Sequence, residues 1–323
     1  MSNILVTGGA GYIGSHVVEK LIKLKKRVFI IDNLSTGYRK LINKKAKFFF
    51  CDIQNFKKVE KIIRNNKIHS VIHLAASLSV AESQKKPKKY YKNNVQGTRN
   101  IIKACQANDI KNFIFSSTCA VYKDRISSVK EESILKPQSV YGTTKLLAEK
   151  LIINKLKNNK MNYAILRYFN VAGASNSGRI GQISKGDQLF KNLSMVIKNK
   201  KPEINIYGND YNTKDGTCIR DYIHASDIGR IHILVLKRIN KIKKSIILNC
   251  GYGNGISVLD VVKEFQKQIK KNIKIKYKNK RKGDMEKIVS NNKKIKKFLN
   301  WKPHQSNLAR MVKSCIKWEE KLS

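Results

Sequence analysis

Residues 3–16 read Asn3-Ile-Leu-Val-Thr-Gly-Gly-Ala-Gly-Tyr-Ile-Gly-Ser-His16, and this stretch decides the fold. Its apolar run, Ile4 to Val6, predicts a buried parallel strand, and an amphipathic run from Ile13 to Leu24 predicts the helix that follows. The glycines between them allow a tight turn, in which backbone N–H groups approach a pyrophosphate at the positive end of the helix. Gly14 also lets the helix pack close to the strand.

An acidic residue follows at the position where a dinucleotide site needs one. A second strand, predicted from Arg27 to Ile31, ends in Asp32, at the ~20-residue spacing of a group that binds the adenosine ribose hydroxyls. The glycine pattern alone is weak evidence, because an ordinary turn between a strand and a helix also uses glycine. Together with Asp32 it favours a dinucleotide-binding site.

Composition limits the possible classes of protein. A length of 323 residues suits one large or two closely joined domains, and a composition of 41% apolar residues supplies a core. The net charge of +45 raises a nucleic-acid-binding alternative. However, the lysines are spread along the whole chain, and no basic tail or nucleic-acid motif accompanies them. We expect weak, salt-sensitive binding to polyanions and no specific nucleic-acid partner.

Cysteine spacing and hydropathy indicate the compartment. The six cysteines are scattered without a paired spacing, which argues against a disulfide framework or a zinc site and fits a reducing cytoplasm. No stretch approaches the ~20 apolar residues of a membrane span, and a strand that begins by residue 3 leaves no room for a signal peptide. We therefore expect a cytoplasmic protein with no membrane partner and no bound metal.

Strands and helices alternate through the first half of the chain. Further strands are predicted at 47–51, 70–74, 111–115 and 162–166, and helices near 55–66, 88–107 and 140–157. This order predicts an α/β fold, a Rossmann-like doubly wound parallel sheet over residues 1–170. From residue 171 the alternation fades, which predicts a smaller mixed α/β substrate-binding domain over 171–323, with some segments returning to the Rossmann part.

The sharpest chemical signal is Tyr141-Gly-Thr-Thr-Lys145, because the i,i+4 spacing stacks both functional side chains on one helix face. A free tyrosine, with a pKa of about 10, is a poor base at neutral pH. A lysine cation at roughly 4–6 Å favours the phenolate by ~3–4 kcal/mol at an effective dielectric of about 20. We therefore expect Lys145 to lower the pKa of Tyr141 toward neutrality. A surface pair is the alternative, but Ser117-Thr118 at a preceding strand end favours catalysis.

Seven runs and three more specific ones carry a resemblance to a known family. The chain is similar over nearly its full length to the UDP-glucose 4-epimerases, of the extended short-chain dehydrogenase/reductase superfamily. The runs shared with the wider superfamily include the glycine stretch and Tyr-x-x-x-Lys. The most specific are Tyr207-Gly-Asn-Asp-Tyr211, Asp215-Gly-Thr-Cys-Ile-Arg-Asp-Tyr-Ile-His224 and Arg281-Lys-Gly-Asp284.

The resemblance implies a catalytic role for three residues. Tyr141 would remove the proton from the sugar 4-hydroxyl, Thr118 would hold that oxygen, and Lys145 would bind the nicotinamide ribose and tune Tyr141. Tightly held NAD would accept and return the C4 hydride, so that UDP-glucose and UDP-galactose interconvert without net redox change. The cofactor-binding positions implied are Gly8, Gly11, Tyr12, Ile13, Gly14, Asp32, Asn33, Leu34, Ser35, Thr36, Gly37, Asp52, Ile53, Leu74, Ala75, Ala76, Asn93, Tyr141, Lys145 and Phe169.

The resemblance also implies a UDP-sugar site and a homodimer. The substrate-binding positions implied are Thr118, Tyr141, Asn170, Asn192, Asn205, Ile206, Tyr207, Arg220, Arg281, Asp284 and Ile288. Two arginines in this set suit a diphosphate, since each binds such a group bidentately. Ile288 stands where the family places the residue that limits the C2 substituent, which leaves activity on UDP-N-acetylhexosamines open.

Two alternatives start from the same motifs. Nucleotide-sugar 4,6-dehydratases and C4-decarboxylating relatives begin with the same C4 oxidation. The dehydratases carry an Asp-Glu pair where this chain has Cys119-Ala120. A catalytically idle NAD-binding or nucleic-acid-binding protein is the other alternative. The presence of Thr118, Tyr141 and Lys145 together argues against it.

Overall fold

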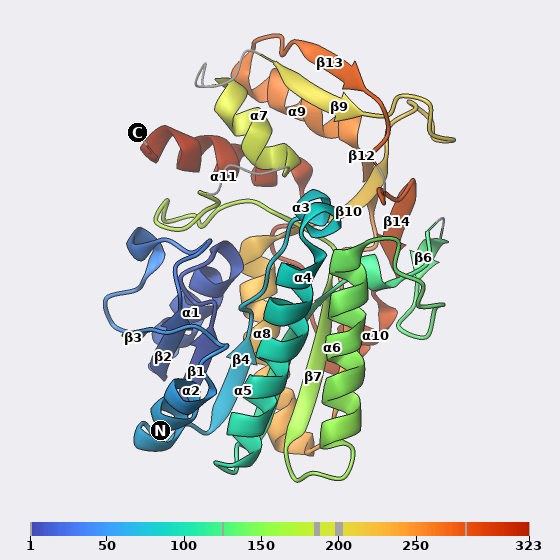
Figure 1. Cartoon of the computed structure of the whole chain (residues 1–323). Helices are drawn as coiled ribbons and strands as arrows, with labels where there is room; N and C mark the ends of the chain where they lie inside the picture. Colours follow the sequence, from blue (N-terminus) through green and yellow to red (C-terminus); the bar gives the residue numbers. More distant parts are fainter. Residues whose placement is uncertain (1, 125, 184–187, 198–202, 282, 323) are drawn as a thin grey trace. The chain divides into compact units, whose positions relative to one another are not determined.

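The computed structural model describes residues 2–124, 126–183, 188–197, 203–281 and 283–322 (Figure 1). Contacts divide the chain into two compact units, which we describe separately. The first unit contains residues 1–121, 139–168 and 228–248, and the second contains 122–138, 169–227 and 249–323. Residues 122–138, which lie inside the domain predicted over 1–170, thus belong to the second unit, and 228–248 return to the first.

The first unit is built on a sheet with the strand order β11-β7-β5-β4-β1-β2-β3. All pairings from β7 to β3 in this order are parallel. The strands are β1 Asn3–Thr7, β2 Arg27–Asp32, β3 Lys47–Phe50, β4 Ser70–His73, β5 Asn112–Thr118, β7 Asn162–Tyr168 and β11 Ile246–Cys250. The chain adds strands first on one side of β1 and then on the other, as in a doubly wound fold. The predicted α/β class is confirmed.

Helices cover both faces of this sheet. The helices and helical turns of this unit are α1 Tyr12–Lys23, η1 Arg39–Leu41, α2 Phe56–Asn65, α3 Val80–Lys85, α4 Pro87–Tyr90, η2 Tyr91–Gln96, α5 Gly97–Gln106, η3 Cys119–Val121, α6 Val140–Leu156 and most of α8 Ala225–Ile242. The helix predicted over 88–107 is divided into α4, the π-helical turn η2 and α5. In Figure 1, α5 and α6 lie in front of the sheet.

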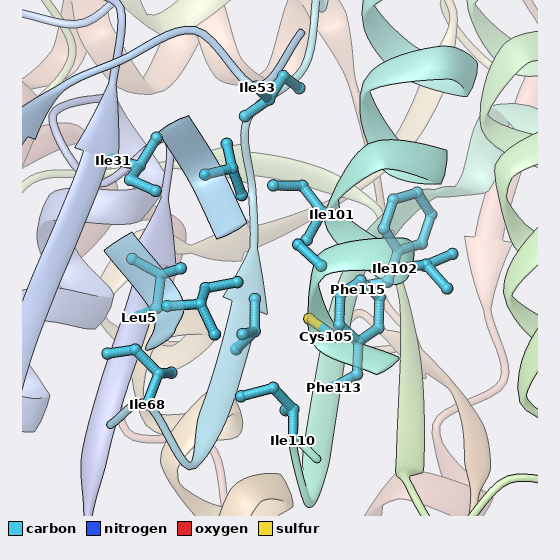
Figure 2. Close-up of a cluster of buried hydrophobic side chains, with 14 of the residues drawn as sticks. Leu5, Ile31, Ile53, Ile68, Ile101, Ile102, Cys105, Ile110, Phe113 and Phe115 are labelled. Atoms are coloured by element: carbon cyan, nitrogen blue, oxygen red, sulfur yellow. The ribbon is translucent and has the colours of Figure 1, made fainter. Parts of the chain in front are cut away.

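The core between the sheet and α2, α5 and α6 consists of aliphatic and aromatic side chains (Figure 2). Leu5 of β1, Phe113 of β5 and Ile102 of α5 are almost fully buried within it. Neighbouring strand residues such as Ile4 and Ile114 are buried too, on the opposite face. Burial on both faces explains the continuous apolar runs of the sequence, because each such side chain contributes about 1.5–3 kcal/mol on leaving water.

The second unit is a mixed α/β structure. One sheet has the order β12-β10-β14-β6, with β8 beside β10, and a separate ladder pairs β13 with β9. The strands are β6 Ile126–Val129, β8 Asn170–Ala172, β9 Ile204–Tyr207, β10 Ile219–His224, β12 Gly255–Ser257, β13 Ile275–Lys278 and β14 Lys287–Ser290. The helices are α7 Leu189–Ile197, α9 Val258–Ile269, α10 Lys293–Leu299 and α11 Leu308–Lys321.

The core of the second unit lies between its helices and β9 and β10. The Phe190 ring of α7 contacts the rings of Tyr222 and Phe265, with centroids 5.2 and 5.7 Å apart. Helix α9 begins where Ser257 caps it by accepting a hydrogen bond from the Asp260 amide at 2.9 Å. Among the helices of the described residues, none has the length and apolar character needed to cross a membrane.

Candidate active site

The glycine loop packs so closely that side chains would not fit at two of its glycines. Gly8 has φ +72°, and a Cβ atom there would come within 2.7 Å of the Ala75 amide nitrogen. A Cβ atom on Gly14 would collide with the carbonyl oxygen of Gly8. Gly11 is the N-cap of α1 and offers no side-chain acceptor, so the first amides of α1 are not capped from within the helix. This cradle fits a phosphate-bearing cofactor.

Asp32, at the end of β2, organises the loop that follows it. Its carboxylate accepts hydrogen bonds from the amides of Ala10, at 3.0 Å, and Leu34, at 2.8 Å. Burial raises the pKa of Asp32, and these two hydrogen bonds oppose the rise. A Cβ atom on Gly37 would lie 2.8 Å from the same carboxylate. Asp32 therefore ties the glycine loop to residues 33–37, where the candidates Ser35 and Thr36 are exposed.

The ends of β2 and β3 bring two more adenosine candidates together. The Asn33 side-chain amide donates to Oδ2 of Asp52 at 2.8 Å. Oδ1 of Asp52 accepts a hydrogen bond from the Gln54 backbone amide. Ile53 is buried between this turn and α5, where a Cβ atom on Gly97 would collide with it. The structure thus places Asn33, Asp52 and Ile53 beside one another.

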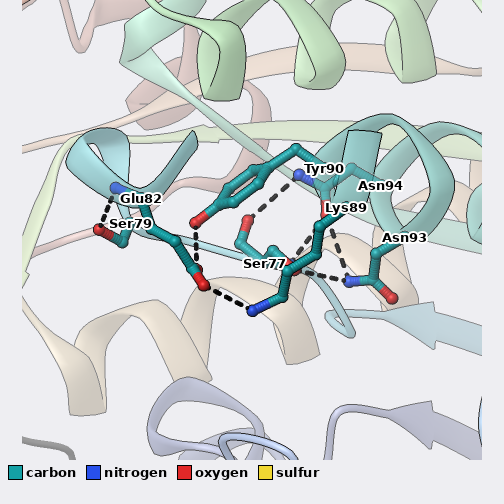
Figure 3. Close-up of polar contacts among 7 residues, drawn as sticks. All are labelled: Ser77, Ser79, Glu82, Lys89, Tyr90, Asn93 and Asn94. Atoms are coloured by element: carbon teal, nitrogen blue, oxygen red, sulfur yellow. Dashed lines mark hydrogen bonds and ion pairs between the residues drawn. The ribbon is translucent and has the colours of Figure 1, made fainter. Parts of the chain in front are cut away.

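Figure 3 shows how the segment after β4 is held. Ser77 donates its backbone amide to Asn94 at 2.8 Å and accepts the Asn93 side-chain amide at 3.2 Å. The π-helical turn η2 presents both asparagines, and Asn94 also donates to Thr144 of α6 at 3.1 Å. The candidates Leu74, Ala75 and Ala76 precede Ser77, and the first two donate backbone hydrogen bonds to Thr7 at the end of β1.

Three candidate catalytic residues meet in the first unit at the carboxyl end of β5 and the start of α6. Ser139 caps α6 by accepting the Gly142 amide at 3.1 Å, which puts Tyr141 in the first helical turn. Tyr141 hydrogen-bonds the Thr118 side chain. The Lys145 ammonium donates to the Ser116 carbonyl at 2.6 Å and is 2% exposed.

Burial sets the protonation of this group. It raises the pKa of Tyr141 to about 12, and the Thr118 hydrogen bond opposes that rise in part. It lowers the pKa of Lys145 to about 7, while the Glu149 carboxylate opposes the fall. The expected lowering of the Tyr141 pKa is therefore not found in the protein alone. The loss of water around a buried phenolate outweighs the attraction to the Lys145 ammonium on which the expectation was based.

In the second unit, three substrate candidates form one cluster. The guanidinium carbon of Arg281 lies 4.3 Å from the centre of the Tyr207 ring. Its Nε donates to the Asp284 carboxylate at 2.9 Å. A stacked and paired guanidinium is held in one orientation, as a planar cation that recognises an anion requires.

The other substrate candidates surround β10 and β9. Arg220 of β10 is the register partner of Ile288 of β14, which is 1% exposed. Asn170 of β8 pairs with Tyr222 of β10. Asn205, which is exposed, and the buried Ile206 lie on β9, and Asn192 lies on α7, which packs against β9. Phe169, a cofactor candidate, is buried directly after β7 and donates its amide to Cys250.

Sequence reasoning missed a buried pair behind the catalytic residues. Arg167 of β7 binds the Glu149 carboxylate of α6 through two hydrogen bonds of 3.0 and 2.7 Å. Glu149 lies four residues after Lys145, and this spacing could have indicated that the two side chains share one face of the helix. The strand order that brings Arg167 opposite it was not readable from the sequence. Within the described ranges, no group of three or more His, Cys, Asp or Glu residues is arranged to hold a metal ion.

Comparisons with known proteins agree with this arrangement. Residues 4–251 match the model of the NAD dependent epimerase/dehydratase family. A UDP-glucose 4-epimerase of Lactobacillus helveticus is 39% identical over 319 residues, covering 98% of this chain and 97% of that protein.

Two solved structures are similar along the whole length. A UDP-glucose-4-epimerase from Stenotrophomonas maltophila, with bound NAD and formylated UDP-arabinopyranose, has a TM-score of 0.95 and 32% identity, covering 100% of this chain and 99% of that one. The UDP-Glc/GlcNAc 4-epimerase of Campylobacter jejuni has a TM-score of 0.86 and 37% identity, covering 99% of this chain and 100% of that one. With a matching family model over most of its length and relatives of this similarity, the chain belongs to the NAD dependent epimerase/dehydratase family.

Proposed function

We propose that this protein catalyses the NAD-dependent, redox-neutral interconversion of UDP-glucose and UDP-galactose by transient oxidation at sugar C4. The observation that carries the proposal is the grouping of Thr118, Tyr141 and Lys145 at the carboxyl edge of a sheet whose glycine loop fits a dinucleotide. The relative from Lactobacillus helveticus, with which the chain aligns over nearly its full length, is named a UDP-glucose 4-epimerase.

The proton of the sugar 4-hydroxyl passes to Tyr141. Burial penalises a lone phenolate and a lone ammonium alike, so the Tyr141 phenolate forms together with the Lys145 ammonium, one helical turn away. Thr118, bonded to Tyr141, holds the sugar oxygen between them. In the return step Tyr141 gives the proton back to the same oxygen, and both residues regain their starting state.

The cofactor would be held by residues of the first unit. Gly8, Gly11 and the first turn of α1 would hold the pyrophosphate, and Asp32 with Asn33 would hold the adenosine part. NAD, when bound, supplies reversible acceptance of the C4 hydrogen with its electron pair. Because the cycle restores the cofactor, tight retention is compatible with repeated turnover.

The nucleotide part of the substrate would be held by the second unit. Arg281, fixed by Tyr207 and Asp284, supplies a charged, planar donor that suits a diphosphate or a uracil oxygen. Arg220 supplies a second guanidinium, whose Nη1 is directed to the carbonyls of Ile219 and Glu286. Binding through UDP leaves the hexose less constrained. The sugar needs this freedom in order to present both faces of C4 to the cofactor in turn.

Product analysis tests the proposal. Purified protein is incubated with UDP-galactose, without added NAD, and the nucleotide sugars are separated by chromatography. We expect UDP-glucose to form until equilibrium is reached, and conversion by Tyr141→Phe to be at least ~10²-fold slower. A 4-keto-6-deoxy product, or release of NADH in proportion to substrate, would instead indicate a dehydratase or a dehydrogenase.

A second candidate activity is epimerisation of UDP-N-acetylhexosamines. The Campylobacter jejuni relative is named for both glucose and N-acetylglucosamine substrates, and Ile288 is smaller than a tyrosine at the expected C2 position. UDP-N-acetylgalactosamine in the same assay tests this.

We also propose a cytoplasmic location, supported by six cysteines that are all free thiols, and a homodimer, supported by the family resemblance. Sedimentation analysis tests the dimer.

A further inference from the structure

A buried ion pair lies directly behind Lys145. Glu149 is 1% exposed and Arg167 is 2% exposed. Arg167 Nε donates to one oxygen of the Glu149 carboxylate at 3.0 Å, and its Nη2 donates to the other at 2.7 Å. This bidentate geometry is the strongest that a guanidinium and a carboxylate adopt. It joins β7 to α6.

The same carboxylate is joined to β5. The Ser117 hydroxyl donates to Glu149 as well, and Ser117 is the register partner of Arg167 on the adjacent strand. The preceding residue, Ser116, accepts the hydrogen bond of Lys145. The ion pair and the catalytic lysine thus contact successive residues of one strand, immediately before Thr118.

Electrostatics couples the pair to the lysine. Lys145 and Glu149 are four residues apart on α6, so they share one face of the helix. Burial disfavours the Lys145 ammonium, and the Glu149 carboxylate is the charge that opposes this. Arg167 brings a second positive charge to that carboxylate, which offsets part of its attraction for Lys145. Loss of one member of a buried ion pair leaves the remaining charge uncompensated.

We propose that Glu149 and Arg167 are positioning residues that tune the charge on Lys145: Glu149 favours the protonated lysine, and Arg167 offsets part of that effect. The inference deepens the proposed function, on which its catalytic meaning rests. It predicts opposite effects of the two partners, whereas a purely structural ion pair predicts the same effect from either loss.

Other groups around Lys145 leave this assignment intact. From α6 itself, Tyr141 and Glu149 lie four residues to either side of the lysine and share its helix face. From β4 it meets His73, whose pKa burial lowers to about 3, so that this ring is neutral at physiological pH. From β5 it meets the Phe115 ring, whose centre is 4.6 Å from the ammonium. Glu149 is therefore the acidic group among these neighbours, and Arg167 is bonded to it.

The test measures the titration of Lys145 directly. Protein labelled with ¹³C at lysine Cε is titrated by NMR as purified, with its NAD content measured in parallel. The Lys145 resonance is the one missing from Lys145→Arg. We expect Glu149→Gln to lower its midpoint by about 1–3 pH units, as loss of a nearby opposite charge does. We expect Arg167→Met to raise it, because Glu149 is then shared with fewer cations.

Two further variants keep the test decisive. If a single variant fails to fold, Glu149→Gln combined with Arg167→Met removes both charges, which buried pairs often tolerate, and its midpoint should lie between those of the single variants. The matched control is the buried pair Lys191 and Glu319 of the second unit, 2.5 Å apart. Glu319→Gln should leave the Lys145 midpoint unchanged.

The outcomes separate this inference from the proposed function. Equal midpoints in wild type, Glu149→Gln and Arg167→Met, or shifts in the same direction, would overturn it. The titration needs no substrate, so a protein that titrates as expected but converts no UDP-galactose contradicts only the proposed function. In an active enzyme, Glu149→Gln should lower kcat increasingly as the pH rises, with little change in KM for UDP-galactose.

Discussion

The ammonium group of Lys145 donates a hydrogen bond of 2.6 Å to the carbonyl oxygen of Ser116. This bond fixes α6 against β5 two residues before Thr118, so the helix that carries Tyr141 and the strand that carries Thr118 are held together by the lysine between them. The arrangement makes the roles of these residues separable by substitution.

Replacing Tyr141 by phenylalanine removes the proposed proton acceptor and little else. We expect kcat to fall by at least the ~10²–10⁴-fold typical of general acid–base catalysis, with NAD and UDP affinity nearly unchanged. Steady-state kinetics and UDP titration calorimetry measure this. Tyr163→Phe is the control, because Tyr163 lies at the amino end of β7, at the edge of the sheet away from Thr118 and Tyr141. Comparable turnover in Tyr141→Phe would remove Tyr141 from the mechanism.

The glycine cradle predicts that the protein purifies with NAD. Denaturing fresh protein and assaying the released nucleotide should yield NAD, and turnover should need none added. Gly14→Ala should abolish retention, since the new Cβ would collide with the Gly8 carbonyl. Gly229→Ala is the control, because its Cβ would come within 3.1 Å of the α1 backbone at His16 and its nearest neighbours do not include the Gly8 turn. NAD retained in Gly14→Ala would place the cofactor elsewhere.

Lys145 predicts a pH dependence of stability in the NAD-free protein. Its folded pKa, lowered by burial to about 7, lies below the unfolded value, so the unfolded chain binds more protons between the two. The lysine therefore destabilises the fold below pH 7, and this cost disappears as the pH rises toward ~10.4. We expect Lys145→Met to melt higher than wild type near pH 7, with the difference shrinking by pH 10. A difference that does not change with pH contradicts the shift.

Several elements were predictable because their signals are local. The glycine loop, Asp32 and the predicted strands lie where the sequence placed them, since turn chemistry and apolar runs act over a few residues. The junction of Arg167 with Glu149 depends on β7 pairing with β5, a long-range event that no short pattern encodes. Likewise, 122–138 leaves the first unit because β6 pairs with β14. The pKa of Tyr141 was misjudged because burial depends on the whole surrounding structure.

The cluster in the second unit predicts a selective effect on substrate affinity. Arg281→Lys keeps the charge but loses the planar group that stacks on Tyr207 and pairs with Asp284. We expect KM for UDP-galactose to rise about 10-fold with kcat nearly unchanged, as for loss of uniform binding. Arg64→Lys is the control, because Arg64 forms an exposed ion pair with Glu60 on α2. If kcat falls instead and KM does not move, Arg281 is not a nucleotide anchor.

Residue 288 predicts the sugar range. A hydrophobic wall altered by a few methylenes discriminates by only about 1–3 kcal/mol, so UDP-hexoses should be better substrates, with detectable activity on the N-acetylated pair. Ile288→Tyr should suppress the N-acetyl activity and spare hexose turnover. Because Ile288 is 1% exposed, the melting temperature of the variant must be measured alongside. Parallel loss of both activities in a stably folded variant, or no change, shows that Ile288 does not line the C2 pocket.

Isotope retention tests whether the hydrogen on C4 is removed and then returned to the same carbon. UDP-galactose carrying deuterium at C4 is incubated with the purified protein in ordinary water, and the UDP-glucose formed is examined by mass spectrometry and NMR. We expect UDP-glucose to retain the deuterium at C4, because the hydrogen leaves and returns within one active site. UDP-glucose with hydrogen from water at C4 would contradict it, and so would the absence of any UDP-glucose.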